Sequence, residues 1–153
     1  MMRSRFVLGA VIVALAGVGC SKTELTPIAT VEQIMETTVE PVSNKVFDAA
    51  AWENGVQVGG PKNDDDWKMV EANARMLAET GNLLLMGSRM KDQTGWVTRT
   101  RAMMDAANEA AKAAAAKNTD AVFKAGATIY EACTGCHQQY INPLTVQPRA
   151  GAN

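Results

Sequence analysis

The chain has few of the residues that build metal centres and β-sheets. It contains 153 residues, of which one is histidine, three are cysteine and only 5% are aromatic. A structural zinc takes four Cys or His ligands, and Cys20 lies far along the sequence from the other two cysteines, so no zinc site is expected. The alternating apolar pattern of strands is missing, as is any internal repeat of helix pairs. Alanine and methionine are common instead, which is typical of a helical protein.

The first nineteen residues have the pattern of a secretory signal peptide. Arg3 and Arg5 precede an unbroken run of apolar and small residues, Phe6 to Gly19, which is too short to span a bilayer comfortably. A basic start, a short apolar middle and small residues before a cleavage point are typical of export, whereas a retained anchor would need a longer run. We therefore expect residues 1–19 to be removed on export.

Cleavage would leave a single acidic domain. The 134 remaining residues carry 13 Lys+Arg against 16 Asp+Glu, a net charge of −3, because the removed segment holds two basic residues and no acids. This length is enough for one domain with one core. The negative charge argues against a nucleic-acid partner and against electrostatic docking on anionic lipid.

Cys20 is predicted to carry lipid. Its setting, Leu15 to Ser21, is similar to a bacterial lipoprotein lipobox, in which the cysteine is acylated and becomes the mature N-terminus, although Gly17 stands where a leucine-like residue is usual. The alternative is ordinary cleavage, for example after Ala16, which would leave an odd free thiol in an oxidising compartment. We expect lipidation, a tether over residues 20–26, and a periplasmic protein anchored by lipid to a bacterial membrane.

The most informative motif is Cys133-Thr134-Gly135-Cys136-His137. On a helix Cys133, Cys136 and His137 lie on one face, and this pattern is the signature of covalent attachment of haem c. The two thiols would bond the porphyrin vinyl groups, and His137, the one histidine in the chain, would be the proximal ligand of the iron. A redox dithiol is the alternative, but such pairs usually follow a strand in a βαβ unit, and the residues before Cys133 read as helix.

Four helices are predicted, the first of them after Thr26-Pro27, a cap with proline in the first turn. This helix ends at Asn54-Gly55, and Pro41 should kink it, because proline removes a hydrogen bond and crowds the preceding turn. Residues 56–63 read as a loop. The buried stripe predicted from the 3–4 spacing of apolar residues comprises Ile28, Val31, Met35, Val39, Val42 and Val46.

The other three helices follow at short intervals. The second starts at Asp64-Asp65-Asp66, whose charge suits a helix N-terminus better than it suggests a metal site, and a turn at Lys91 to Gly95 follows it. Trp96 opens the third helix, whose alanine-rich end, Ala110 to Ala116, allows close approach of another helix or of a bulky cofactor. Asn118-Thr119-Asp120 caps the fourth helix, which carries the CxxCH motif.

Four amphipathic helices with short connections favour an all-α fold. The predicted architecture is an antiparallel up-down-up-down four-helix bundle over residues 27–141, with residues 142–153 as a flexible tail. Cofactors in such bundles lie in the core between helices. The haem would be held by the last helix and covered by the others. It would supply much of the core, so we expect the haem-free chain to be loosely packed.

Together these features resemble the class II c-type cytochromes, which are the cytochrome c′ group and its low-spin relatives. Members are four-helix bundles whose CxxCH motif lies near the C-terminal end of the last helix, as Cys133 to His137 do here. The likeness extends over residues 27–141. Its other matching segments are Ile34-Met35 with Pro41, Asn82-Leu83-Leu84 within the stretch Leu77 to Leu85, and Trp96.

The resemblance implies that a residue of the first helix governs the second face of the iron. A methionine there gives a six-coordinate, low-spin electron carrier, whereas an apolar side chain that does not ligate leaves the iron open to small gases. Met35 occupies the corresponding place. It would be the distal ligand and raise the reduction potential, or it would only fill the core, as methionine commonly does. Gas-binding members usually carry Arg or Lys after the aromatic that follows the motif; here Tyr140 is followed by Ile141, which favours electron transfer.

The predicted function is therefore that of an exported mono-haem electron carrier and not an enzyme. His137 and Met35 would stay bound to the iron, and periplasmic or membrane redox proteins would dock at a partly exposed haem edge through a small, weak interface. The alternative is a five-coordinate protein that binds NO or CO. A peroxidase is not supported, because the chain has no second histidine and no distal Arg–His pattern. Membrane contact is expected only through the N-terminal lipid, and a homodimer is compatible with the sequence without being required.

Overall fold

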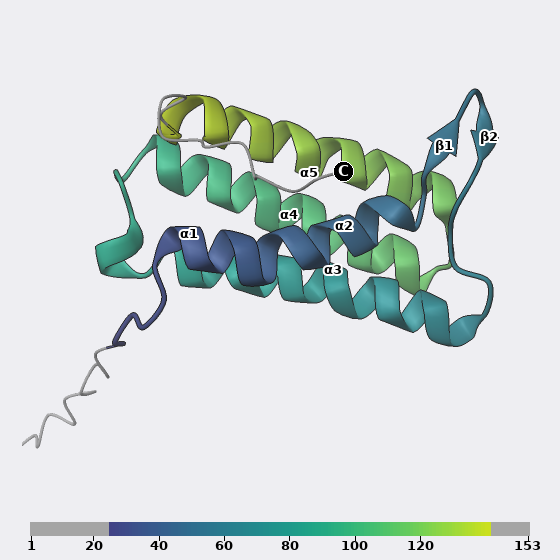
Figure 1. Cartoon of the computed structure of the whole chain (residues 1–153), viewed down its shortest axis with the longest axis horizontal. Helices are drawn as coiled ribbons and strands as arrows, with labels where there is room; N and C mark the ends of the chain where they lie inside the picture. The colour runs from purple at the N-terminus through teal and green to yellow at the C-terminus, as the bar shows by residue number, and fades with distance from the viewer. Residues whose placement is uncertain (1–24, 142–153) are drawn as a thin grey trace, which may run out of the picture.

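A computed structural model describes residues 25–141 of the chain (Figure 1). The predicted signal peptide 1–19, the lipidation site Cys20, most of the tether 20–26 and the tail 142–153 lie outside the described residues. Residues 25–141 are mostly helical, which confirms the predicted all-α class. None of the helices in this range has the length and apolar character needed to cross a membrane.

The first helical segment consists of three consecutive parts. These are α1 (Val31–Ile34), the π-helical turn η1 (Met35–Val39) and α2 (Glu40–Asp48). A capping box starts the segment: the Gln33 N–H donates to Thr30 Oγ1 at 3.1 Å, and the Thr30 N–H donates to Gln33 Oε1 at 2.9 Å. This reciprocal pair satisfies two free donors of the helix end. The predicted start at Thr26-Pro27 is therefore wrong, and Ile28 is 90% exposed instead of buried.

The π-helical turn shifts the buried face of this segment by one residue. Ile34 and Val39 are both buried although they are five residues apart, because a π turn adds one residue to the α-helical repeat. The turn ends just before Pro41, which lies in the first turn of α2 and has no N–H to donate. A kink was predicted at Pro41; what the structure shows just before it is this wider turn. The buried positions that result in this segment are Ile34, Val39, Ser43 and Val46.

A short β-hairpin follows α2, where a continued helix and then a loop had been predicted. Strands β1 (Trp52–Glu53) and β2 (Val56–Gln57) pair antiparallel. The two residues between them, Asn54 with φ +50° and Gly55 with φ +78°, form the left-handed two-residue turn that Asn-Gly favours. The same dipeptide that was interpreted as a helix end is a hairpin turn.

Three long helices make up the rest of the fold. They are α3 (Asp64–Leu84), α4 (Gly95–Ala115) and α5 (Thr119–Tyr140), with a 3-10 turn η2 (Gly87–Arg89) between the first two. Asn63 caps α3, since its Oδ1 accepts from the N–H groups of Asp65 and Asp66 at 2.9 and 3.0 Å. Asn118 caps α5 by accepting from the Ala121 N–H at 3.0 Å. Both helix starts agree with the prediction, and the aspartate run belongs to a capped first turn.

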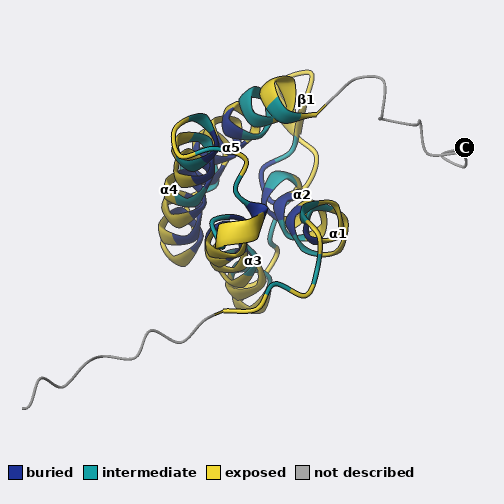
Figure 2. Cartoon of the chain, turned by 90° about the vertical axis from the view of Figure 1, so that its left-hand side faces the viewer, coloured by how far each residue is buried: buried dark blue, intermediate teal, exposed yellow. Residues whose placement is uncertain are grey.

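The helices lie side by side, and consecutive segments run in opposite directions (Figure 1). Buried residues face the space between them, with exposed residues on the outside (Figure 2). Helix α4 packs extensively on both α3 and α5, whereas α2 contacts α3 and has little contact with α5. The interior is therefore closely packed around α4 and less so between α2 and α5.

The alanine-rich end of α4 serves helix packing. Ala107, Ala110, Ala111 and Ala114 are each almost completely buried, since small side chains let neighbouring helices approach closely. None of these alanines lines the large cavity described below. Of the two predicted uses of this segment, contact with neighbouring helices is the one that the structure bears out.

Candidate cofactor site

The CxxCH motif occupies the last turns of α5. Cys133 and Cys136 are half-buried free thiols, and His137 is exposed. Burial raises the pKa of both thiols; at Cys136 the nearby Arg99 charge acts in the opposite direction. The motif is part of a continuous helix and does not follow a strand, unlike the usual setting of a redox dithiol.

A cavity of about 810 Å³ lies beside these residues. The first helical segment contributes Val39 and Phe47 to its walls, α3 contributes Leu84, and α4 contributes Met103. The cavity thus fills the space between α2 and α5, the two helices that have little direct contact. Its lining is mainly apolar, and its volume falls in the range of about 300–1,000 Å³ that is typical of small-molecule and cofactor sites.

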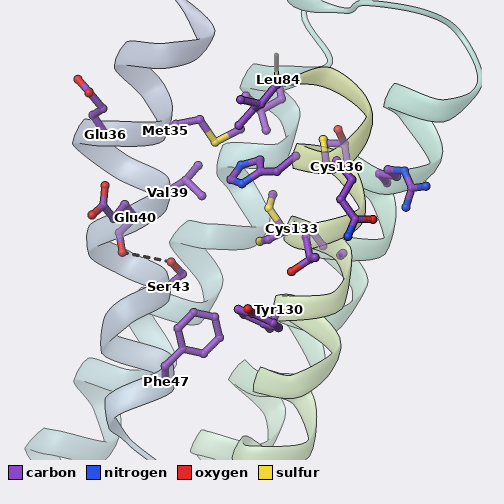
Figure 3. Close-up of a pocket in the computed structure, with 18 residues that line it drawn as sticks. Met35, Glu36, Val39, Glu40, Ser43, Phe47, Leu84, Tyr130, Cys133 and Cys136 are labelled. Atoms are coloured by element: carbon purple, nitrogen blue, oxygen red, sulfur yellow. Dashed lines mark hydrogen bonds between the residues drawn. The ribbon is translucent and has the colours of Figure 1, made fainter. Parts of the chain in front are cut away.

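Met35 faces the CxxCH motif across this cavity. Its side chain extends from η1 into the space between the helices, with Cys133 and Cys136 on the other side (Figure 3). Cys133, Cys136, His137 and Met35 all line the same cavity. The structure therefore brings together the two thiols, the imidazole and a thioether from segments about a hundred residues apart in the sequence. Cys20 lies outside the described residues.

A cluster of hydrogen-bonded side chains secures the C-terminal end of α5. The Tyr140 hydroxyl donates to Asp92 Oδ2, and the Tyr140 ring packs edge-to-face on buried Trp96 at a centroid distance of 5.1 Å. Asp92 Oδ1 also accepts from the N–H groups of Thr94 and Trp96 at 2.8 and 3.1 Å. Tyr140 thus packs at the end of this helix. The cluster ties the end of α5 to the start of α4.

The same contacts perturb two pKa values. The hydroxyl of Tyr140, followed by the N–H of Thr94, holds the pKa of Asp92 at about 2. Partial burial and then the hydrogen bond to Asp92 raise the pKa of Tyr140 to about 12. Both shifts favour the protonation states in which a neutral phenol donates to a carboxylate. The contact therefore persists through the neutral pH range.

Two arginines near the site were not identified from the sequence. Arg89 is buried, and its guanidinium donates to the main-chain oxygen of Ala29 at 3.0 and 2.9 Å and to that of Leu83 at 3.1 Å. Arg99 lines the cavity and lies against Gly135. Neither has a local sequence signal, because each acts on residues of another element. Asp92 did have a local sequence signal, because an Asp shortly before the start of a helix is a capping pattern.

The residues present fit a covalently attached haem. Two thiols and an imidazole are available on one helix face, an apolar cavity adjoins them, and a thioether lies on the opposite wall. Within residues 25–141 no group of three or more His, Cys, Asp or Glu side chains could hold a bare metal ion. Two thiols, one imidazole and one thioether are the donors that the described residues offer around this cavity.

Comparison of the chain with family models, curated protein sequences and solved structures gave no match. The CxxCH motif and the geometry of the cavity are therefore the observations that bear on function.

Proposed function

We propose that this chain is an exported c-type cytochrome with one haem, related to class II, whose described helices form the family's four-helix bundle. Cys133 and Cys136 hold the haem through thioether bonds, His137 is the proximal ligand and Met35 is the distal ligand. When bound, the haem supplies reversible one-electron chemistry. The protein is a carrier that passes electrons between periplasmic or membrane redox proteins and is held at a bacterial membrane through lipid on Cys20.

The observation that carries this proposal is the convergence of four donor side chains on one cavity. A CxxCH motif alone would support attachment, but it would say nothing about the second face of the iron. Met35 comes from the first helical segment, yet it lines the same cavity as His137. A thioether opposite an imidazole is a ligand pair of electron-carrying cytochromes, and this pair raises the reduction potential of the iron.

The wall residues would keep the site suited to electron transfer. Val39 and Leu84, which line the cavity near Met35, make that part of its wall apolar (Figure 3), and an apolar shell limits the access of solvent to a site. The cluster of Tyr140, Asp92 and Trp96 holds the helix end that carries His137. Held in this way, His137 would keep its position when the bound haem is oxidised or reduced.

Two matched substitutions test the ligand assignment. Met35→Leu and Met103→Leu each remove one sulfur from the wall of the same cavity at nearly constant volume. In the oxidised, haem-loaded protein we expect a sulfur-to-iron charge-transfer band that is lost in Met35→Leu and kept in Met103→Leu. The reverse pattern would show that the wrong methionine is assigned.

The unsubstituted protein distinguishes the carrier from the gas-binding alternative. A low-spin spectrum with slow or absent carbon monoxide binding is expected for the carrier. A high-spin spectrum with rapid binding of carbon monoxide to the reduced form would contradict it. The mass of the mature protein, measured on the same sample, reports both the covalent haem and the lipid on Cys20.

A further inference from the structure

Arg99 places a permanent positive charge at the CxxCH turn. Its side chain is partly buried on α4, and its Nε–H donates to Gln139 Oε1 at 3.1 Å. A Cβ atom on Gly135 would overlap one guanidinium nitrogen of Arg99 and lie 3.0 Å from its central carbon. The guanidinium therefore packs directly against the main chain between Cys133 and Cys136.

No carboxylate among the described residues is paired with Arg99. Arg99 takes part in none of the ion pairs found among residues 25–141. Within that part of the chain it is also the one Lys or Arg side chain that lines the large cavity. The acids that line the cavity, Glu36 and Glu40, come from the opposite wall and point away from the cysteines (Figure 3).

The charge of Arg99 lies at the face of α5 that carries the motif, because its guanidinium lies against Gly135 and its Nε–H donates to Gln139. Such a charge is only partly solvated, so its influence on that face is weakly screened.

We propose that Arg99 is a positioning residue for the attachment turn and that its fixed charge raises the reduction potential of the haem bound there. This inference rests on the proposed function. A planar guanidinium can lie flat on the glycine main chain and hold Gln139 at the same time, which a lysine cannot do. A nearby cation favours the reduced cofactor, whose iron carries one positive charge less, and net charge is among the properties that set such potentials.

Redox titration of the haem-loaded full chain tests the charge. Arg99→Gln is expected to lower the equilibrium constant for reduction at least threefold, which is about 28 mV at 59 mV per tenfold for one electron. Arg99→Lys keeps the charge and should stay close to the unsubstituted protein. Arg101→Gln removes an exposed charge from the same helix and should change little.

Three outcomes overturn this electrostatic role. One is a potential unchanged in Arg99→Gln, and another is an equal shift in Arg101→Gln, which would indicate a general effect of net charge. If Arg99→Lys shifts the potential as far as Arg99→Gln, the charge does not set the potential and the electrostatic role is wrong. If the chain carries low-spin haem and any of these results is found, the role of Arg99 is wrong while the proposed function stands. Absence of attached haem contradicts the proposed function.

A double-mutant cycle tests the contact independently. Gly135→Ala should lower the denaturant midpoint of the haem-loaded protein, because its new methyl group meets the guanidinium. In an Arg99→Ala background the same change should cost much less. Additive effects of the two substitutions would show that Arg99 does not pack on Gly135.

Discussion

Replacing Arg89 by methionine should destabilise the protein and loosen the helical segment that carries Met35. The Arg89 guanidinium makes two hydrogen bonds to the oxygen of Ala29 and one to that of Leu83. Ala29 directly precedes the capping residue of α1, whereas Leu83 is at the end of α3. The Arg89 side chain therefore fixes the start of α1 against the end of α3.

The size of the effect follows from the acceptors that lose their partner. Hydrogen bonds to a charged group contribute about 1.5–3 kcal/mol each. Two carbonyl groups lose such a donor, and methionine keeps most of the apolar contact of the arginine stem while avoiding the cost of burying a charge. We expect a loss of about 2–3 kcal/mol, a large part of the 5–15 kcal/mol typical of a domain.

Denaturant unfolding of Arg89→Met measures this loss, and Arg75→Met is the matched control. Arg75 lies on the surface of α3, where it pairs with Glu71 four residues earlier, and such pairs contribute about 0.3–0.5 kcal/mol. Amide exchange of residues 31–34 should become faster in Arg89→Met only. If the two variants unfold at the same denaturant concentration, Arg89 does not anchor the first helix.

Two further predictions concern the helix that carries the CxxCH motif. Replacing Tyr140 by phenylalanine should lower stability most between about pH 4 and pH 10. In the folded protein the pKa of Asp92 is lowered from 3.8 to about 2, so the stability that this carboxylate contributes is lost as the pH falls from about 4 to about 2. The pKa of Tyr140 is raised from 10.0 to about 12, so the stability that this phenol contributes is lost as the pH rises from about 10 to about 12. Thermal melts of both proteins against pH check this, and a pH-independent difference would contradict it. Gly126→Ala should stabilise the protein by about 0.5–1 kcal/mol, because the new Cβ would lie 3.5 Å from Phe47 in ordinary contact; a lower melting temperature would refute it.

Local patterns predicted the long helices well because their signals lie within a few residues. Asn63 and Asn118 cap the helices that follow them, and the spacing of Cys133, Cys136 and His137 already places these residues on one helix face. The first segment was predicted less well. Its apolar spacing was interpreted at the α-helical repeat, and the π turn at Met35–Val39 changes that repeat.

The Asn54-Gly55 hairpin shows a different kind of error. The dipeptide is a strong turn signal, but the flanking strands are only two residues each and are exposed, so no alternating pattern could reveal them. Arg99 had no signal at all, because its contact with Gly135 joins residues of two helices. Such contacts depend on how helices pack, which no local pattern contains.

Five consecutive residues already supply the chemistry, because the two thiols and the lone imidazole share one helix face. The surroundings of these groups come from the packing of the helices. The sparse contact between α2 and α5 leaves a cavity at the motif, and the packing of the first segment brings Met35 to its far wall. Helical periodicity acts over a few residues, whereas the position of one helix against another depends on the whole set of side chains between them.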